Sequence, residues 1–108
     1  MSYSIKLSSR FQREAKKLIK KYTSLLSELN ELRTNLQENP VQGTPIAHGC
    51  YKIRISIASK GKGKSGGARV ITYVYVEGKT IYLLAIYDKS EQESISNKEL
   101  KSLLKEIK

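Results

Sequence analysis

Near Pro45 the spacing of apolar side chains changes from the period of a helix to that of a strand, which limits the folds open to this chain. Before that point, Ser9-Arg10-Phe11-Gln12 has the form of a capping box and predicts a helix with Ser9 at its N-cap. A second helical series follows, and Asn39-Pro40 ends it because the residue before a proline disfavours helical geometry. The two series predict a helical hairpin with the apolar positions Phe11, Ala15, Leu18, Ile19 and Tyr22, then Leu25, Leu29, Leu32 and Leu36.

After Pro45 the chain is typical of strands and ends in one more helix. The predicted strands alternate in side-chain type or are rich in β-branched and aromatic residues. Ser96-Asn97-Lys98-Glu99 is a second capping box, which predicts the last helix. With a short first strand, the order predicts a single α+β domain over residues 1–108, its helices on one side of an antiparallel sheet. The predicted strands are residues 3–7, 51–58, 68–76 and 80–87.

The positive charge is large and is concentrated in the stretch from Lys52 to Arg69. The 108 residues include 20 Lys and Arg against 10 Asp and Glu, a formal net charge of +10. Like charges held close together cost stability, so we expect an anion to compensate them, and phosphate is the commonest candidate. The stretch contains six cations and no anion: Lys52, Arg54, Lys60, Lys62, Lys64 and Arg69.

Other residue counts exclude several classes of protein. A single cysteine, Cys50, forms no internal disulfide, and one cysteine with one histidine, His48, builds no zinc site. The same count excludes a ribonuclease that uses a pair of histidines. The sequence has no signal peptide and no apolar run of membrane-spanning length, so we expect a cytoplasmic protein without a membrane partner.

Residues 58–65 come close to a phosphate-binding P-loop but do not fit its mechanism. The run ends in Gly63-Lys64-Ser65, yet Ala58 stands at the position of the first glycine. A P-loop also needs a helix directly after it, and here a predicted strand follows. We therefore reject nucleotide binding by this loop.

Three blocks of sequence resemble the RelE/ParE superfamily of toxins from bacterial type II toxin–antitoxin pairs, most closely the HigB-like members of the RelE branch. The order of elements agrees over nearly the whole chain. The resemblance implies a RelE-like fold and a small ribonuclease that uses no metal or cofactor, cuts mRNA in the ribosomal A site and is silenced by an antitoxin. The blocks are Tyr51-Lys52-Ile53-Arg54, residues 59–71 from Ser59 to Ile71, and Leu83-Leu84-Ala85-Ile86-Tyr87-Asp88-Lys89.

The family's working residues correspond to particular positions here. The resemblance places its strand cations at Lys52, Arg54 and Arg69 and a further one at Lys89. RelE also uses a tyrosine at the start of its last helix, where this sequence has Ile95. The candidate catalytic set is Lys52, Arg54, Lys64, Arg69 and Lys89, and the candidate RNA or ribosome contacts are Lys60, Lys62 and Tyr87.

These residue types suit cleavage of RNA through its own 2′-hydroxyl. That reaction needs a base, stabilisation of a dianionic phosphorane and a proton for the leaving 5′-oxygen. Crowded positive charges favour the neutral form of a lysine, so one of the lysines is a candidate base. Arginine stays charged and holds two phosphate oxygens at once.

Three other functions remain open from the sequence. The ParE branch shares the fold and poisons DNA gyrase, a plain RNA-binding module would bind without cleaving, and a degenerate toxin would keep only its antitoxin. The expected partners of the toxin are an acidic cognate antitoxin, with a helix-turn-helix as one option, together with the ribosome and mRNA.

Overall fold

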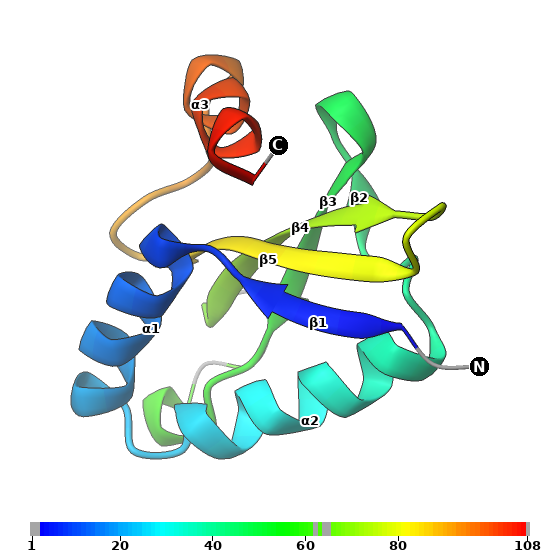
Figure 1. Ribbon diagram of the computed structural model, residues 1–108. Helices are drawn as coiled ribbons and strands as arrows, with labels where there is room; N and C mark the ends of the chain where they lie inside the picture. The colour runs from blue at the N-terminus through cyan, green and yellow to red at the C-terminus, as the bar shows by residue number, and fades with distance from the viewer. Residues whose placement is uncertain (1–2, 62, 64–65, 108) are drawn as a thin grey trace.

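The computed structural model describes residues 3–61, 63 and 66–107. Figure 1 shows one sheet with helices on both sides. Short 3-10 turns precede β3 and follow it, at Ala47–Gly49 and Ala58–Lys60. The helices are α1 (Ser9–Lys21), α2 (Leu25–Glu38) and α3 (Asn97–Ile107), and the strands are β1 (Ser4–Leu7), β2 (Thr44–Pro45), β3 (Cys50–Ile55), β4 (Ala68–Tyr75) and β5 (Thr80–Asp88).

The strands form one mostly antiparallel sheet in the order β1-β5-β4-β3-β2. β1 pairs parallel to β5, and the other three pairings are antiparallel. The α+β class and the C-terminal helix predicted from the sequence are confirmed. The two-residue strand β2 was not predicted, and β3 ends at Ile55, whereas alternation had predicted a strand to residue 58.

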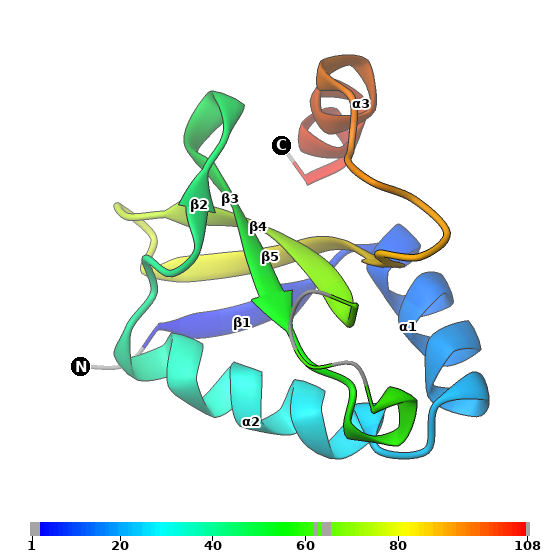
Figure 2. The same ribbon diagram turned by 180° about the vertical axis from the view of Figure 1, so that it is seen from behind.

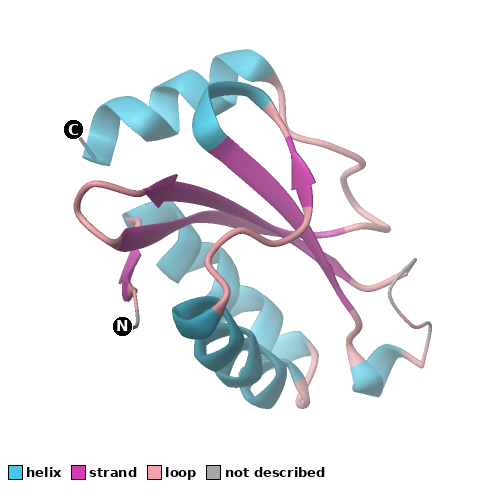
Figure 3. Cartoon of the chain, turned by 90° about the vertical axis from the view of Figure 1, so that its right-hand side faces the viewer, coloured by secondary structure: helices cyan, strands magenta, loops and turns pink. Residues whose placement is uncertain are grey.

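The helices cover both faces of the sheet, so the prediction of one covered side is wrong. α1 and α2 pack on one face, against residues such as Ile53, Val70 and Ile81. α3 packs on the other face through Leu100, Leu103 and Leu104, as Figure 3 shows edge-on. Periodicity identifies the apolar side of a helix but does not say which face of the sheet that side covers.

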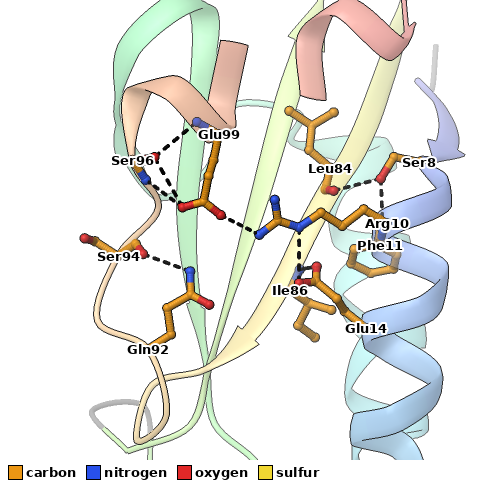
Figure 4. Close-up of polar contacts among 10 residues, drawn as sticks. All are labelled: Ser8, Arg10, Phe11, Glu14, Leu84, Ile86, Gln92, Ser94, Ser96 and Glu99. Carbon is orange, nitrogen blue, oxygen red and sulfur yellow. Dashed lines mark hydrogen bonds and ion pairs between the residues drawn. The ribbon is translucent and has the colours of Figure 1, made fainter. Parts of the chain in front are cut away.

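The capping residue of α1 is Ser8, not Ser9 as predicted. The Ser8 hydroxyl accepts a hydrogen bond from the Phe11 amide at 3.0 Å and donates one to the Leu84 carbonyl oxygen at 2.7 Å (Figure 4). Ser8 is buried and Ser9 is exposed, so only Ser8 can reach the carbonyl oxygen on β5. The second predicted box is confirmed, because the Glu99 amide donates to the Ser96 hydroxyl at 3.1 Å.

A β-bulge in β5 reverses the direction of the side chains near its end. Thr72 pairs with Leu83 and Ile71 pairs with Ala85, which leaves Leu84 as the extra residue. α1 contacts this part of β5, where β1 no longer pairs: the Glu14 carboxylate accepts a hydrogen bond from the Ile86 amide at 3.1 Å. As a result Tyr87 lies on the α3 face and not on the face of Ile81 and Leu83.

Arg10 connects α1 to α3 near the same strand. Its guanidinium lies 3.2 Å from the Glu14 carboxylate and 3.0 Å from the Glu99 carboxylate, as Figure 4 shows. Burial opposes the charge of Arg10, but both carboxylates favour it, and the net effect is a raised pKa. These two ion pairs of Arg10 hold the start of α3 beside the end of β5.

No helix in the described part of the chain has the length and apolar character to cross a membrane.

Candidate active site

A row of three polar side chains crosses three adjacent strands on the α3 face of the sheet. The register places Arg54 of β3 directly opposite Arg69 of β4, and Arg69 directly opposite Tyr87 of β5. Lys52 lies two residues before Arg54 on the same face, opposite Ile71. We call Arg54, Arg69 and Tyr87 the basic row. It lies where β3 ends and β4 begins, at the lower end of these strands in Figure 2.

Arg69 is the buried centre of the basic row. Only 3% of its surface is exposed, and its Nη1 donates a hydrogen bond to the Ala68 carbonyl oxygen at 3.1 Å. Burial lowers the pKa of its guanidinium, the charge of Arg54 lowers it further, and Tyr87 acts in the opposite direction. Arginine nevertheless remains charged at any ordinary pH.

Tyr87 and Arg54 differ in how far they reach solvent. The Tyr87 ring is buried, and its hydroxyl lies 3.5 Å from the Glu93 carbonyl oxygen, a long hydrogen bond. Burial raises the pKa of the Tyr87 phenol, although Arg69 acts against that change. The phenol therefore keeps its proton at neutral pH. Arg54 is exposed and Lys52 is half-buried, so the β3 side of the row is open to solvent.

Lys89 lies just beyond β5 and next to the start of β4. Its backbone amide donates a hydrogen bond to the Gly67 carbonyl oxygen at 3.0 Å, and its Nζ lies 3.6 Å from a Glu93 carboxylate oxygen. That carboxylate is 91% exposed, so the ion pair is weak and a phosphate could replace it.

Lys60, one of the predicted lysine contacts, does not join the basic row. Lys60 points away from it, into an ion pair with Asp88 of 2.7 Å, and its side chain is only 7% exposed. Lys62 and Lys64 lie outside the described residues.

Two residues weighed in the sequence have ordinary surroundings. His48 is exposed in the turn before β3, at a positive φ of 61°. Cys50 is buried, and burial raises the pKa of its thiol to about 11, so the thiol is unreactive at neutral pH. Among the described residues, no group of three His, Cys, Asp or Glu side chains could hold a metal ion.

Sequence reasoning did not assign a role to Asp88 or Tyr22, which the structure brings together. The Tyr22 hydroxyl donates a hydrogen bond to the Asp88 carboxylate at 2.6 Å. An aspartate directly after the run Leu83–Tyr87 was a usable signal, because a charged group near a core is normally paired. Its partners come from distant parts of the chain and could not be found from spacing.

The fold and the basic row define a class of protein: a small α+β domain with clustered cations on one face of its sheet. Comparison with known families gives the class a name. The family model described as the RelE toxin of the RelE/RelB toxin–antitoxin system matches residues 4–108, and the chain belongs to this family.

Solved structures of the family share the fold at low sequence identity. The isolated E. coli RelE toxin is 18% identical with a TM-score of 0.63, and the match covers 99% of this chain and 100% of that one. The intact E. coli RelBE toxin–antitoxin complex gives 19% identity and a TM-score of 0.57, covering 81% and 96%. A RelBE2 toxin–antitoxin complex from Mycobacterium tuberculosis gives 15% identity and a TM-score of 0.58, covering 82% and 99%.

Proposed function

We propose that this chain is a ribosome-dependent endoribonuclease that inhibits translation by cutting mRNA in the A site. The observation that carries the proposal is the direct pairing of Arg54 with Arg69 across two strands, with Tyr87 next in register. Like charges directly opposite each other destabilise a sheet. An anionic substrate that binds both arginines would offset this cost.

The basic row suits the charges that develop when RNA is cleaved. The 2′-oxygen attacks the phosphorus, the bond to the 5′-oxygen breaks, and the products are a 2′,3′-cyclic phosphate and a 5′-hydroxyl. Arg54 and Arg69 would hold the non-bridging oxygens of the phosphorane, where negative charge is greatest. Preorganised donors of this kind are worth about 10²–10³ in rate when one is removed from other enzymes.

Tyr87 and Lys52 are the candidates for moving protons. Tyr87 keeps its proton at neutral pH and lies beside Arg69, which suits donation to the leaving 5′-oxygen. Lys52 lies on the same face, two residues before Arg54, and is the described lysine best placed to take the proton of the 2′-hydroxyl. Lys89 would bind a neighbouring phosphate, because only an exposed carboxylate competes for it.

An antitoxin is the expected protein partner. Two of the related structures are toxin–antitoxin complexes. A net charge of +10 favours an acidic partner, and such a partner would compete with RNA for the same cations. The order of events would then be release from the antitoxin, entry into the ribosome and cleavage.

The proposal is tested with purified protein, ribosomes and a defined mRNA, mapping the new 5′ ends by primer extension. We expect breaks at codons placed in the A site, and none in free mRNA. Arg69→Ala should lower the single-turnover rate by about 10²–10³, and the exposed Arg54→Ala by a similar factor, while Arg33→Ala on α2 serves as the matched control. Intact mRNA together with inhibited gyrase would overturn the proposal in favour of the ParE-like alternative.

A further inference from the structure

Asp88 is a buried carboxylate that receives hydrogen bonds from three parts of the chain. Its side chain has no exposed surface. It accepts hydrogen bonds from the Tyr22 hydroxyl at 2.6 Å, the Lys60 ammonium at 2.7 Å, and the Ser90 hydroxyl and amide at 2.7 and 2.9 Å. Burial alone would raise the pKa of this carboxyl, but Lys60, Tyr22 and Ser90 outweigh burial and hold the pKa well below its ordinary value.

Lys60 contributes more than one contact to this cluster. Its Nζ also lies 3.3 Å from the Ser90 hydroxyl and 5.3 Å from the centre of the Tyr22 ring, a cation–π distance. Tyr22 therefore contacts both members of the ion pair, one through its hydroxyl and one through its ring. The cluster of Tyr22, Lys60 and Asp88 connects the end of α1, the segment after β3 and the end of β5.

Neighbouring hydrogen bonds fix the same segment against the N-cap and first turn of α2. The Ala58 amide donates to the Glu28 carboxylate at 2.7 Å, and the Ser59 amide donates to the Ser24 hydroxyl at 3.0 Å. The segment after β3 is thus held at three successive residues, of which Lys60 is the last. Figure 2 shows this turn beside the start of α2.

The cluster lies directly behind the basic row. Asp88 follows Tyr87 in β5 and pairs with Ala68, the residue before Arg69. Lys60 belongs to the connection that runs from Arg54 to Arg69. Tyr87 is thus next to Asp88 along the chain, Arg69 is next to Ala68, the residue that pairs with Asp88, and Arg54 lies six residues before Lys60. The side chains of the cluster meet on the opposite face of the sheet.

We propose that the buried Lys60–Asp88 pair, together with Tyr22, is a positioning device that sets the geometry of Arg54, Arg69 and Tyr87. This inference rests on the proposed function. Lys60 and Asp88 do not touch the substrate; they hold the ends of β3, β4 and β5 at the spacing that lets two arginines and a phenol meet one phosphate. Displacement of a catalytic group by about 1 Å can lower a rate by about 10²-fold.

Stability alone does not explain a buried ion pair at this place. Replacing both members of such a pair with uncharged side chains of similar size often leaves stability unchanged or raises it. Removing one member alone leaves the other charge buried without compensation and is strongly destabilising. The double variant Lys60→Met with Asp88→Asn therefore separates the two roles. If the pair only stabilises the fold, a double variant with wild-type stability should also cleave as the wild type does.

The test compares the two single variants, the double variant and Leu36→Ala, a core change on α2 away from the row. For each, the unfolding midpoint in urea and the single-turnover cleavage rate on programmed ribosomes are measured, together with ribosome affinity. We expect the double variant to recover stability relative to the singles and yet cleave about 10–100-fold more slowly at saturating ribosomes, with affinity little changed. Lys60→Arg, which keeps the charge, should cleave faster than the double variant and more slowly than the wild type. Leu36→Ala should lose stability with no loss of rate in the folded protein.

A second measurement keeps the inference testable without cleavage. The side-chain Nε–H NMR signals of Arg54 and Arg69 should shift in the double variant, while that of Arg33 stays in place. Unchanged arginine signals, or a double variant that cleaves at the wild-type rate, would overturn the positioning role. A wild-type protein that leaves mRNA intact while these signals still shift would overturn the proposed function and leave the positioning role standing.

Discussion

The position of Tyr87 in the candidate site depends on one irregularity of the sheet. The bulge at Leu84 turns Tyr87 from the α1 face to the α3 face, where it meets Arg69. Within the described part of the chain, its hydroxyl makes one long hydrogen bond, so removing the hydroxyl costs the fold little. Tyr87→Phe should therefore leave the free energy of unfolding within about 1 kcal/mol of the wild type.

The same substitution should slow cleavage strongly if Tyr87 donates the proton. Loss of a general acid typically lowers a rate by about 10²–10⁴. The measurement is the single-turnover rate on programmed ribosomes, with Tyr75→Phe, an exposed tyrosine of β4, as the matched control. An RNA leaving group that needs no proton, such as a 5′-thiolate, should restore the rate of Tyr87→Phe. A variant that cleaves as fast as the wild type would assign the proton to another group.

Asp88 makes stability depend on pH in the acid range, in the same direction as Glu99, whose pKa is lowered chiefly by its hydrogen bond with Arg10. The pKa of Asp88 in the folded protein lies below the ordinary value of about 3.9, so the unfolded chain takes up the proton first as the pH falls. The stabilisation is complete above about pH 5 and is lost as the pH falls towards the folded pKa. Urea unfolding at several pH values from 6 to 2 should show a flatter pH dependence for Asp88→Asn than for the wild type. Parallel curves for the two proteins would contradict this account.

At the scale of elements, Ser8 joins a helix start to a strand bulge. Ser8→Ala removes the cap of α1 and leaves the Leu84 carbonyl oxygen without its hydroxyl donor, for an expected loss of about 1–3 kcal/mol in unfolding free energy. Ser9→Ala, one residue later and exposed, should change it by less than about 0.5 kcal/mol. Chemical denaturation of the two variants checks both values, and equal losses would remove the distinction between the two serines.

The same two serines show what sequence reasoning can and cannot reach. The box at Ser96 was predicted correctly, because Ser96 and Glu99 bond to each other and need no distant partner. Ser9 satisfied the same local pattern, yet Ser8 forms the cap because β5 supplies a buried acceptor 76 residues away. A cap formed by residues close in sequence can be predicted from their spacing, whereas a cap selected by a tertiary contact cannot.

Strand alternation had the same limit at the candidate site. Alternation in β3 placed Lys52 and Arg54 on one face, and the register then brought Arg69 opposite Arg54. In β5, simple alternation would have put Tyr87 with Ile81 and Leu83, and only the bulge moves it beside Arg69. A bulge depends on pairing with β4 and on packing against α1, so the period of 2 along one strand does not reveal it.

At the scale of the whole molecule, the charge becomes a distribution over surfaces. Lys60 is neutralised by Asp88, and Arg10 by Glu14 and Glu99, so these cations do not add to the field available for RNA. Arg54 remains exposed, and the acidic partner of Lys89 among the described residues, Glu93, is itself exposed. The total of 20 Lys and Arg therefore overstates the number of cations that can bind phosphate.

This distribution predicts how RNA binding depends on salt. Each phosphate of single-stranded RNA that a cation neutralises adds about 0.7 to the slope of log affinity against log salt concentration, because a counterion is released. Arg54→Ala should lower the magnitude of the slope by about 0.7 for each phosphate that Arg54 binds, and Lys60→Arg, whose charge stays paired with Asp88, should leave it unchanged. Fluorescence anisotropy with a short labelled RNA, repeated over a range of NaCl concentrations, gives both slopes. An unchanged slope for Arg54→Ala would mean that RNA binds elsewhere on the basic surface and that the basic row is not its binding site.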